Sequence, residues 1–287
     1  MSAARWDLAG RTVFITGAAR GIGAESARQL SRRGANLALA GLEPERLQAL
    51  AAKLGDGAAW WEVDVRDADA LNGAVAAAAE RFGGLDAVIA NAGIRPPSAT
   101  VATVEPDDFE RVIDINLLGV WRTVRAALPH LVERRGYALG IASLAAALHS
   151  PMMAPYAAAK AGVEAFMNSL RLEVEGKGVA VGTGYFGFID TDMVREAFAQ
   201  RGADRLTERS PAFMLRPLPV AVAGKAIADG IERRARRVYA PKWILPALMA
   251  SGTFQHVADA GTRRAGGLEE ALAEVESAPE HPADPAS

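Results

Sequence analysis

Two side chains that are able to exchange a proton lie four residues apart in the segment A-P-Y-A-A-A-K-A-G, residues 154–162. Alanine favours helix, so Tyr156 and Lys160 are predicted to share one helical face. A free phenol has a pKa of about 10, and a cation one helical turn away favours the phenolate and lowers that pKa. The pair therefore suits general acid–base chemistry. The simpler alternative is a packed tyrosine ring beside a lysine that reaches into water.

A second pattern with chemical meaning is the glycine-rich segment T-G-A-A-R-G-I-G, residues 16–23. It follows an apolar run that is typical of a buried strand, and it opens a predicted helix. Gly17 permits the sharp turn, while Gly21 and Gly23 let the backbone and the helix approach a pyrophosphate. The helix N-terminus then offers free N–H groups. The alternative is a tight turn without a ligand. The residues predicted to contact a dinucleotide here are Gly17, Arg20, Gly21, Ile22 and Gly23.

Two later strand ends supply further candidate contacts with a dinucleotide. Asp64 ends the third predicted strand, where a carboxylate accepts from an adenine amino group or, alternatively, caps the next helix. N-A-G at 91–93 ends the fourth strand, and its small residues would let the chain pass beside a ribose. The candidate contacts outside the first turn are Gly41, Leu42, Glu43, Asp64, Val65, Asn91, Ala92 and Gly93.

The end of the second predicted strand, A-G-L-E-P at 40–44, bears on the choice between NAD and NADP. An acid there accepts from the ribose 2′-OH of NAD, whereas a nearby arginine pairs with the 2′-phosphate of NADP. Gly41 and Leu42 provide neither group. Glu43 is able to reach the ribose and would repel a phosphate, but Arg20 would attract one. These indications conflict, with a slight preference for NAD.

The elements that must position these residues alternate between apolar strands and amphipathic helices. The sequence predicts strands at 11–17, 36–41, 58–65, 85–93, 137–143 and 179–185, and helices at 23–33, 44–54, 68–82, 107–133 and 155–175. This alternation predicts an α/β fold with a single Rossmann-like, doubly wound parallel sheet and helices on both faces. Sites in such sheets lie beyond the carboxyl ends of the strands, where Gly17, Gly41, Asp64, Asn91 and Ser143 fall.

The pattern loosens after the sixth strand. Residues 192–218 are expected to form a lid-like insertion, after which a helix at 219–234 and a strand at 237–240 return to the sheet. The apolar segment 241–253 is expected to cover the core or a subunit interface, with a membrane surface as a weaker alternative. We expect residues 1–266 to form one dinucleotide-binding and catalytic domain. Residues 267–287 are expected to be a disordered acidic tail that begins with a frayed helix.

Composition narrows the class of protein further. The 287 residues carry a net charge of −2, with no basic excess to bind nucleic acid or an anionic membrane. The chain has no cysteine, and its four histidines do not pair at metal-ligand spacing, so neither a disulfide nor a zinc site is expected. No apolar run reaches the ~18 residues of a transmembrane helix. We therefore expect a soluble, cytoplasmic protein.

The motifs occur together in an order that resembles the short-chain dehydrogenase/reductase family, in its short-subunit branch, from about Leu8 to Ala240. They are T-G-x-x-x-G-x-G, N-A-G, Asn116 in D-I-N-L-L-G, Ser143 and Y-x-x-x-K. The resemblance implies an NAD- or NADP-dependent oxidoreductase that interconverts a ketone or aldehyde and an alcohol by hydride transfer. It also implies that Tyr156 is the general acid and base, that Lys160 lowers its pKa and holds the nicotinamide ribose, that Ser143 orients the carbonyl oxygen, and that Asn116 supports a water.

The resemblance is incomplete after the sixth strand, at Y-F-G-F-I-D-T-D-M, residues 185–193. Family members usually carry P-G there, and Phe186 replaces that proline. Gly187, Ile189 and Thr191 are nevertheless expected to meet the cofactor, by the same resemblance. The family commonly assembles through its two long helices, which implies a homodimer or homotetramer.

Apolar residues near the expected site favour a hydrophobic small-molecule substrate such as a steroid, a terpenoid or an aromatic carbonyl compound. The candidate substrate contacts are Ile94, Leu144, Met153, Phe198 and Met214, although these residues would equally suit the core. Two other functions share parts of this pattern. A non-catalytic dinucleotide-sensing protein would not need the complete catalytic set. An S-adenosylmethionine-dependent methyltransferase shares the glycine-rich turn but gives no reason for Y-x-x-x-K after Ser143.

Overall fold

The computed structural model describes residues 5–199, 215–253, 255–256, 259–260 and 268–277. Within this part of the chain, parallel strands form one seven-stranded sheet in the order β3-β2-β1-β4-β5-β6-β7. The strands are β1 (Thr12–Thr16), β2 (Asn36–Gly41), β3 (Ala58–Glu62), β4 (Ala87–Ala90), β5 (Tyr137–Ile141), β6 (Ala180–Phe186) and β7 (Arg237–Ala240). The crossover from β3 back to β4 beside β1 creates the switch point at which ligands of such sheets bind.

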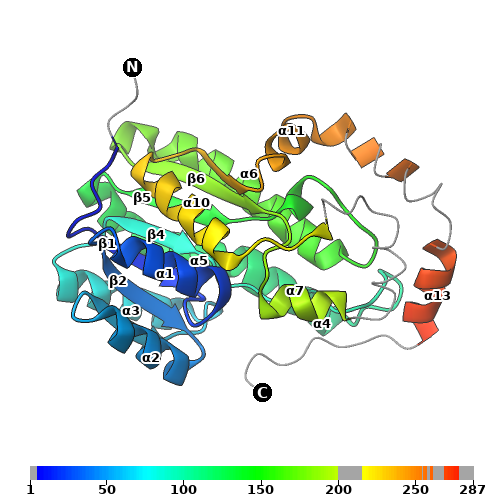
Figure 1. The fold of residues 1–287 in the computed structure, drawn as a ribbon, viewed down its shortest axis with the longest axis horizontal. Coiled ribbons are helices and arrows are strands. Elements are labelled where there is room, and N and C mark those ends of the chain that lie inside the picture. The colour runs from blue at the N-terminus through cyan, green and yellow to red at the C-terminus, as the bar shows by residue number, and fades with distance from the viewer. Residues whose placement is uncertain (1–4, 200–214, 254, 257–258, 261–267, 278–287) are drawn as a thin grey trace.

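Helices cover both faces of the sheet (Figure 1). The long ones are α1 (Gly21–Ser31), α2 (Pro44–Leu54), α3 (Ala68–Phe82), α5 (Gly119–Arg134), α6 (Ala154–Val174) and α10 (Val220–Glu232). Along β1, Phe14 is buried on the face covered by α3, α5 and α6, whereas Val13 and Ile15 are buried on the other face with α1 and α10. This alternation is what a strand buried on both sides requires, and it confirms the predicted doubly wound fold.

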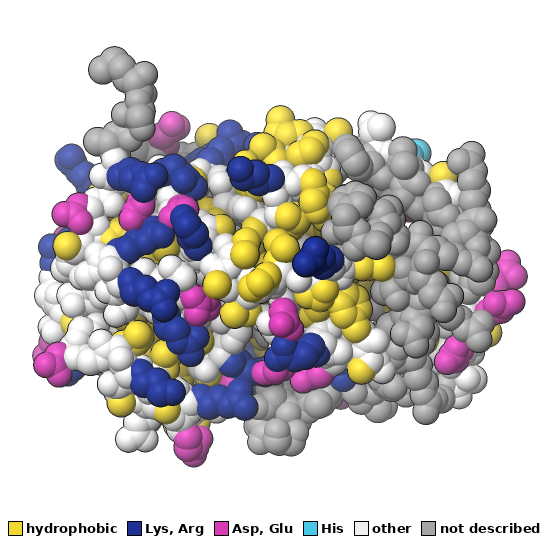
Figure 2. Space-filling view, in the orientation of Figure 1, with side chains coloured by type: hydrophobic (Ala, Val, Ile, Leu, Met, Phe, Trp, Pro, Cys, Tyr) yellow, Lys and Arg dark blue, Asp and Glu magenta, His cyan; other side chains and the backbone are white. Residues whose placement is uncertain are grey.

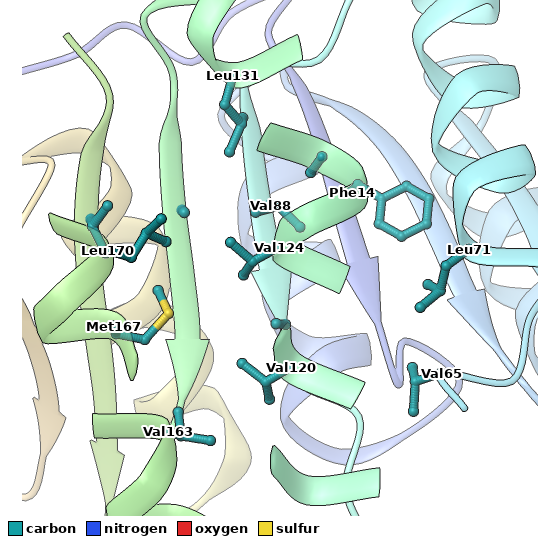
Figure 3. Packing of buried hydrophobic residues seen from close by; sticks show 14 of the residues in the cluster. Phe14, Val65, Leu71, Val88, Val120, Val124, Leu131, Val163, Met167 and Leu170 are labelled. Atoms are coloured by element: carbon teal, nitrogen blue, oxygen red, sulfur yellow. The ribbon is translucent and has the colours of Figure 1, made fainter. Parts of the chain in front are cut away.

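The larger apolar cluster lies between the sheet and helices α3, α5 and α6. Figure 3 shows Val120 and Val124 of α5 beside Val88 of β4, with Met167 and Leu170 of α6 farther along the same layer. All five side chains are at most 4% exposed, so this layer is closed to water. Such burial of branched apolar side chains stabilises the fold and holds the first turn of α6, which carries Tyr156, in a fixed place.

The opposite face is bound together partly by charge. Arg33 of the α1 C-terminal turn pairs with Asp229 of α10 at 2.6 Å, and Lys225 pairs with the same carboxylate at 2.7 Å. Figure 2 shows Lys and Arg side chains gathered over this side of the molecule with acidic side chains among them. These charges therefore form a solvated face in which several arginines already have partners.

The predicted long helix at 107–133 differs from the observed structure at its centre. It consists of α4 (Pro106–Ile113), a π-helical turn at Asp114–Leu118 and α5. A π turn inserts one extra residue into a helix and is frequent at functional sites. Asn116 lies in this turn, so the helix is distorted at the residue that the family resemblance singles out.

The C-terminal part of the chain contains more ordered structure than its sequence led us to expect. Helix α11 (Ile244–Met249) buries Ile244 and Ala247 against the sheet, so this part of the apolar segment packs on the core. Helix α13 (Leu268–Ser277) buries Ala271 and Val275. Residues 268–277 thus form a packed helix rather than a disordered tail, because two apolar residues one helical turn apart are buried by packing.

Three further expectations concern the insertion after β6, membrane-spanning helices and metal sites. The short helix α7 (Asp192–Phe198) begins the expected lid-like insertion, most of which lies outside the described residues. Among the described helices, none combines the length and the apolar character needed to cross a bilayer. The described residues also contain no cluster of three or more His, Asp or Glu side chains suited to a metal ion.

Candidate active site

A cavity opens beyond the carboxyl ends of β1, β2, β4, β5 and β6. It collects residues that are far apart in the sequence but that the motifs had singled out. The predicted site residues that line it are Gly17, Arg20, Gly21, Ile22, Gly41, Leu42, Glu43, Asp64, Val65, Asn91, Ala92, Gly93, Ile94, Ser143, Tyr156, Lys160, Gly187, Ile189 and Thr191. One cavity therefore holds both the glycine-rich turn and the Tyr156–Lys160 pair.

The glycine-rich turn is shaped by close approaches that a side chain would prevent. Gly17 has φ +63°, and a Cβ there would lie 2.8 Å from the Cα of Ala92. A Cβ on Gly23 would lie 2.2 Å from the carbonyl oxygen of Gly17. Gly23 is absent from the cavity lining, and its missing side chain lets α1 pack closely on the turn. Gly21, with φ +56°, faces the cavity near Thr191.

The turn is also held from β4. The side-chain amide of Asn91 donates to the carbonyl oxygens of Thr16 at 3.0 Å and Gly17 at 3.1 Å. Asn91 therefore fixes the shape of the turn. Arg20 is the N-cap of α1 and makes no capping hydrogen bond with its side chain. The first N–H groups of α1 are left to bind an anion, and the helix dipole favours negative charge there. This small-residue cradle fits the pyrophosphate of a dinucleotide.

Arg20 and Glu43, which gave conflicting indications in the sequence, are partners in the structure. The Nε of Arg20 lies 3.2 Å from Oε2 of Glu43, and Nη1 of Arg46 lies 3.1 Å from Oε1 of the same carboxylate. Arg20 also reaches Asp192 of α7 at 3.8 Å. A 2′-phosphate bound here would have to compete with Glu43 for Arg20. Because these side chains are partly exposed to solvent, each ion pair contributes little to stability by itself.

Asp64 follows β3 and does not cap the next helix. Asp67 is the N-cap of α3 and accepts from the backbone of Asp69 and Ala70, so the capping alternative for Asp64 is wrong. Partial burial raises the pKa of Asp64, but hydrogen bonds and charge from Arg66 outweigh it and hold that pKa below its ordinary value. Asp64 is thus an ionised acceptor at the cavity wall.

Ser143 and Tyr156 meet at the other end of the cavity. Ser143 follows β5, and Tyr156 lies in the first turn of α6. Ser143 lies close enough to the Tyr156 phenol for its hydroxyl to lower the pKa of that phenol. Burial raises the pKa of Tyr156, and the Ser143 hydrogen bond lowers it by less. In this structure desolvation outweighs the effect of Ser143 on this phenol, and the lowering of its pKa by Lys160 stays a prediction.

Lys160 lies one helical turn beyond Tyr156 and is only 4% exposed. Its Nζ donates to the carbonyl oxygen of Ile141 at 2.9 Å and lies 5.6 Å from the centre of the Tyr156 ring. Burial lowers the pKa of Lys160 to about 8. The two neighbours therefore shift in opposite directions, and burial favours the uncharged form of each. These shifts move the two pKa values apart, so transfer of the Tyr156 proton to a neutral Lys160 amine is energetically uphill.

Asn116 is fully buried and joins the π-helical turn to the loop after β4. Its Oδ1 accepts from the backbone N–H of Ile94 at 2.8 Å, and its Nδ2 donates to the carbonyl oxygen of Ile94 at 2.9 Å. A Cβ on Gly93 would lie 2.9 Å from Oδ1 of Asn116 and 3.7 Å from Nζ of Lys160. Asn116 thus anchors the N-A-G loop close to Lys160, a positioning role that the motif alone did not reveal.

The candidate substrate residues do not all reach the cavity. Ile94 lines it, whereas Leu144 packs against the core, Met153 is the N-cap of α6, and Phe198 stacks on Phe188 with ring centres 4.9 Å apart. Met214 lies outside the described residues. Val194 of the expected insertion also lines the cavity, and the apolar lining residues that the sequence analysis did not assign to the site are Ala19, Val63, Ile115, Ile141, Ala142, Phe186 and Met193. Most of these directly precede or follow a motif residue, which is the signal that could have found them.

Comparisons with known proteins agree with this geometry. The profile of the family described as short chain dehydrogenase matches residues 11–202. An uncharacterized oxidoreductase of Myxococcus xanthus is 38% identical over 192 residues, which cover 65% of this chain and 75% of that protein. A serine 3-dehydrogenase of Agrobacterium fabrum is 33% identical over 199 residues, 68% of this chain and 79% of its own.

Two further similarities extend the comparison. The 3beta-hydroxysteroid dehydrogenase 1 of Eggerthella lenta is 33% identical over 210 residues, 71% of this chain and 80% of that protein. The crystal structure of gox2181 superposes with a TM-score of 0.73 at 22% identity, covering 81% of this chain and 95% of that one, and so supports the fold. The chain belongs to the short-chain dehydrogenase family of NAD- or NADP-dependent oxidoreductases, enzymes that act on CH–OH and C=O groups.

Proposed function

We propose that this enzyme interconverts a ketone or aldehyde and the corresponding alcohol on a hydrophobic small molecule, with Tyr156 as the group that transfers the proton. The approach of Ser143 to Tyr156, in the cavity that also contains the glycine cradle, is the observation that carries this proposal. The nicotinamide dinucleotide supplies or accepts the hydride when it is bound.

The protein's own residues provide the proton and the orientation. As a carbonyl is reduced, negative charge builds on its oxygen, and the Tyr156 hydroxyl donates its proton there. Because burial raises its pKa, this phenol is protonated at neutral pH and ready to donate. The Ser143 hydroxyl hydrogen-bonds the same oxygen and fixes its direction. During alcohol oxidation the proton moves back along the same path.

Lys160 is proposed to bind a ribose hydroxyl and to assist proton exchange at Tyr156. Its pKa of about 8 means that both protonation states are populated slightly above neutral pH. Its Nζ lies beside Gly93, where the missing side chain leaves room for a ligand. We also propose that Asn116 supports a water that links Lys160 to solvent, in addition to anchoring Ile94.

The cavity lining supports an apolar substrate and a preference for NAD. Ile94, Ile115 and Val194 are among the apolar lining residues, and one relative is named a hydroxysteroid dehydrogenase. A steroid-, terpenoid- or aromatic-type compound is therefore the proposed substrate class. Glu43 would repel a 2′-phosphate while its two arginine partners hold it in place, which supports NAD over NADP.

Exposed apolar side chains support a homodimer or homotetramer. Leu118 and Trp121 at the junction of the π turn and α5 are 38% and 41% exposed, and Leu172 of α6 is 69% exposed. These are the two long helices through which the oligomer is proposed to form. A sedimentation measurement on the wild-type protein would check this proposal.

The experiment is a cofactor titration followed by a substrate panel. NADH and NADPH are titrated side by side, and turnover of hydrophobic ketones and alcohols is then followed by nicotinamide absorbance. We expect Tyr156→Phe to bind the cofactor normally but to lose turnover by a factor of roughly 10²–10⁴. Tyr239→Phe, at a half-buried phenol on β7, is the matched control and should keep wild-type turnover.

Two outcomes would contradict the proposal. Turnover that Tyr156→Phe does not diminish would show that another group transfers the proton. Cofactor binding without turnover of any compound in the panel would favour the alternative of a dinucleotide-sensing protein on the same fold.

A further inference from the structure

The C-terminal segment of the chain contacts the loop that joins the two hydroxyl groups of the active site. We call this segment, comprising α11 and the described residues 250–253, 255, 256, 259 and 260, the C-terminal strap. It lies beyond residues 11–202, the part of the chain that matches the family profile. Buried Ile244 and Ala247 anchor its first helix on the core. Figure 1 shows the strap leaving α11 towards the end of the molecule where α13 lies, away from the N-terminus.

Gln255 of the strap makes this contact through both the oxygen and the nitrogen of its side-chain amide. The backbone N–H of His149 donates to Oε1 at 2.7 Å, and Nε2 donates to the carbonyl oxygen of His149 at 3.0 Å. Nε2 also donates to Oδ1 of Asp259 at 2.6 Å, which fixes the orientation of the amide. Two hydrogen bonds, to the N–H and to the carbonyl oxygen of one residue 106 positions away, fix its main chain as a neighbouring strand would.

His149 lies halfway along the loop between Ser143 and Tyr156. After the short helical turn Leu144–Ala146, the loop reaches α6 with little regular structure. Met152, four residues before Tyr156, has φ +61°, a left-handed conformation that is unfavourable for a residue with a Cβ. A loop with few internal hydrogen bonds and an unfavourable backbone angle holds one geometry only when contacts from outside impose it. Gln255 supplies such a contact.

We infer that Gln255 is a positioning residue for the active site, which holds the loop between Ser143 and Tyr156 so that their two hydroxyl groups meet. This inference rests on the proposed function, in which those hydroxyl groups orient the carbonyl oxygen and transfer the proton. Gln255 touches neither of them and acts through the main chain of His149. The strap would therefore tune the proton-transfer end of the cavity while leaving the glycine cradle unaffected.

The test compares Gln255→Ala and Gln255→Glu with the wild-type enzyme. Gln255→Glu keeps an acceptor for the N–H of His149, but it loses both donated bonds and places a carboxylate beside Asp259. Thr253→Ala, at an exposed strap residue, is the matched control. Three quantities are measured for each protein: the pH profile of kcat/KM for alcohol oxidation, the Kd of NADH, and amide hydrogen exchange in residues 144–153.

Both Gln255 variants should lower kcat/KM by about tenfold, because small misplacements of reacting groups are costly. The Ser143 hydrogen bond lowers the pKa of Tyr156, so its loss should move the rising limb of the profile to higher pH. The nearby charged group Lys160, whose Nζ lies 5.6 Å from the ring centre of Tyr156, is not substituted, so a shift of the profile is expected to come from the Ser143 contact. Exchange in residues 144–153 should become faster, while the Kd of NADH stays within about twofold because the cradle is intact.

An unchanged pH profile together with unchanged exchange in both Gln255 variants would overturn the inference. A uniform fall in activity with a weaker Kd for NADH would also overturn it, because that pattern indicates general destabilisation. Failure of the proposed function is separately visible: Tyr156→Phe would then retain turnover. If Tyr156→Phe is inactive and the Gln255 variants behave as wild type, only the role of Gln255 is refuted.

Discussion

Lys160 should make the stability of this enzyme depend on pH, and Lys160→Met should remove that dependence. The Lys160 ammonium is almost completely buried, and it donates a hydrogen bond to the carbonyl oxygen of Ile141. Burial lowers its pKa to about 8, from 10.5 in an exposed lysine. Between these two values the unfolded chain binds more protons than the folded one. The free energy of unfolding should therefore rise with pH across this window and be lowest below about pH 8.

The size of the effect follows from the same two values. A difference of about 2.5 pH units, at roughly 1.4 kcal/mol per unit, corresponds to a penalty of about 3 kcal/mol when Lys160 must be charged. For one titrating group, the free energy of unfolding should rise by about 2 kcal/mol of this penalty between about pH 7 and pH 9.5. Methionine has a similar length and carries no charge. It leaves the Ile141 carbonyl without its donor, at a cost of about 1–3 kcal/mol that does not vary with pH.

The assay is urea unfolding followed by tryptophan fluorescence, on both proteins, at several pH values from about 7 to 9.5. The useful quantity is the difference between the two free energies of unfolding at each pH. Burial also raises the pKa of Tyr137 and Tyr185, but both proteins contain these groups, so their effects cancel in the difference. We expect wild type to gain about 2 kcal/mol relative to Lys160→Met over this range.

A difference that is constant with pH would refute the reasoning, because it would show that folding does not perturb the titration of Lys160. A change of opposite sign would mean that the folded protein stabilises the charged ammonium. Either result would also contradict the proposal that both protonation states of Lys160 are populated slightly above neutral pH.

Three further changes test other parts of the site and fold. Glu43→Gln should improve the affinity for NADPH relative to NADH on the order of tenfold, because one repelling charge is removed; an unchanged ratio in paired titrations would contradict this. Gly23→Ala should abolish cofactor binding or folding, since its Cβ would lie 2.2 Å from a backbone oxygen, whereas Gly73→Ala, with nothing within 4 Å, should raise the unfolding midpoint. Tyr137→Phe should cost about 1–3 kcal/mol in urea unfolding because it strands the buried Ala235 carbonyl, which accepts from the phenol at 2.7 Å; equal stability would show that water replaces the bond.

Local chemistry explains why much of the fold was predictable. The apolar runs that became β1, β2 and β5 have no polar interruption, so each is stable only inside a sheet covered on both faces. The glycines at 17 and 21 adopt positive φ angles that other residues avoid, and this preference is visible in the sequence itself. The family motifs then indicated which strand ends belong together, and these ends do line one cavity.

The π-helical turn and α13 were not predictable in the same way. The sequence from 107 to 133 has helical character throughout, and the extra residue at Asp114–Leu118 is stabilised by the bonds of Asn116 to Ile94, 22 positions earlier. Helix α13 is acidic and short, and it is held by burial of Ala271 and Val275 together with a hydrogen bond from Thr100 to Glu276. Both features depend on partners that no local pattern reveals.

By itself, the sequence determined the order of the elements and the position of the glycine-rich turn, and it singled out the proposed Tyr156–Lys160 pair, because these follow from backbone preferences and side-chain type. Only the tertiary structure decided how Tyr156 and Lys160 titrate, that Arg20 and Glu43 are partners, and that Gln255 binds the loop at His149. The physical reason is that a pKa depends on burial and on the distance to every nearby charge and dipole. Those quantities are set by segments that are far apart in the sequence, such as Arg33 and Asp229, and that meet only when the chain has folded.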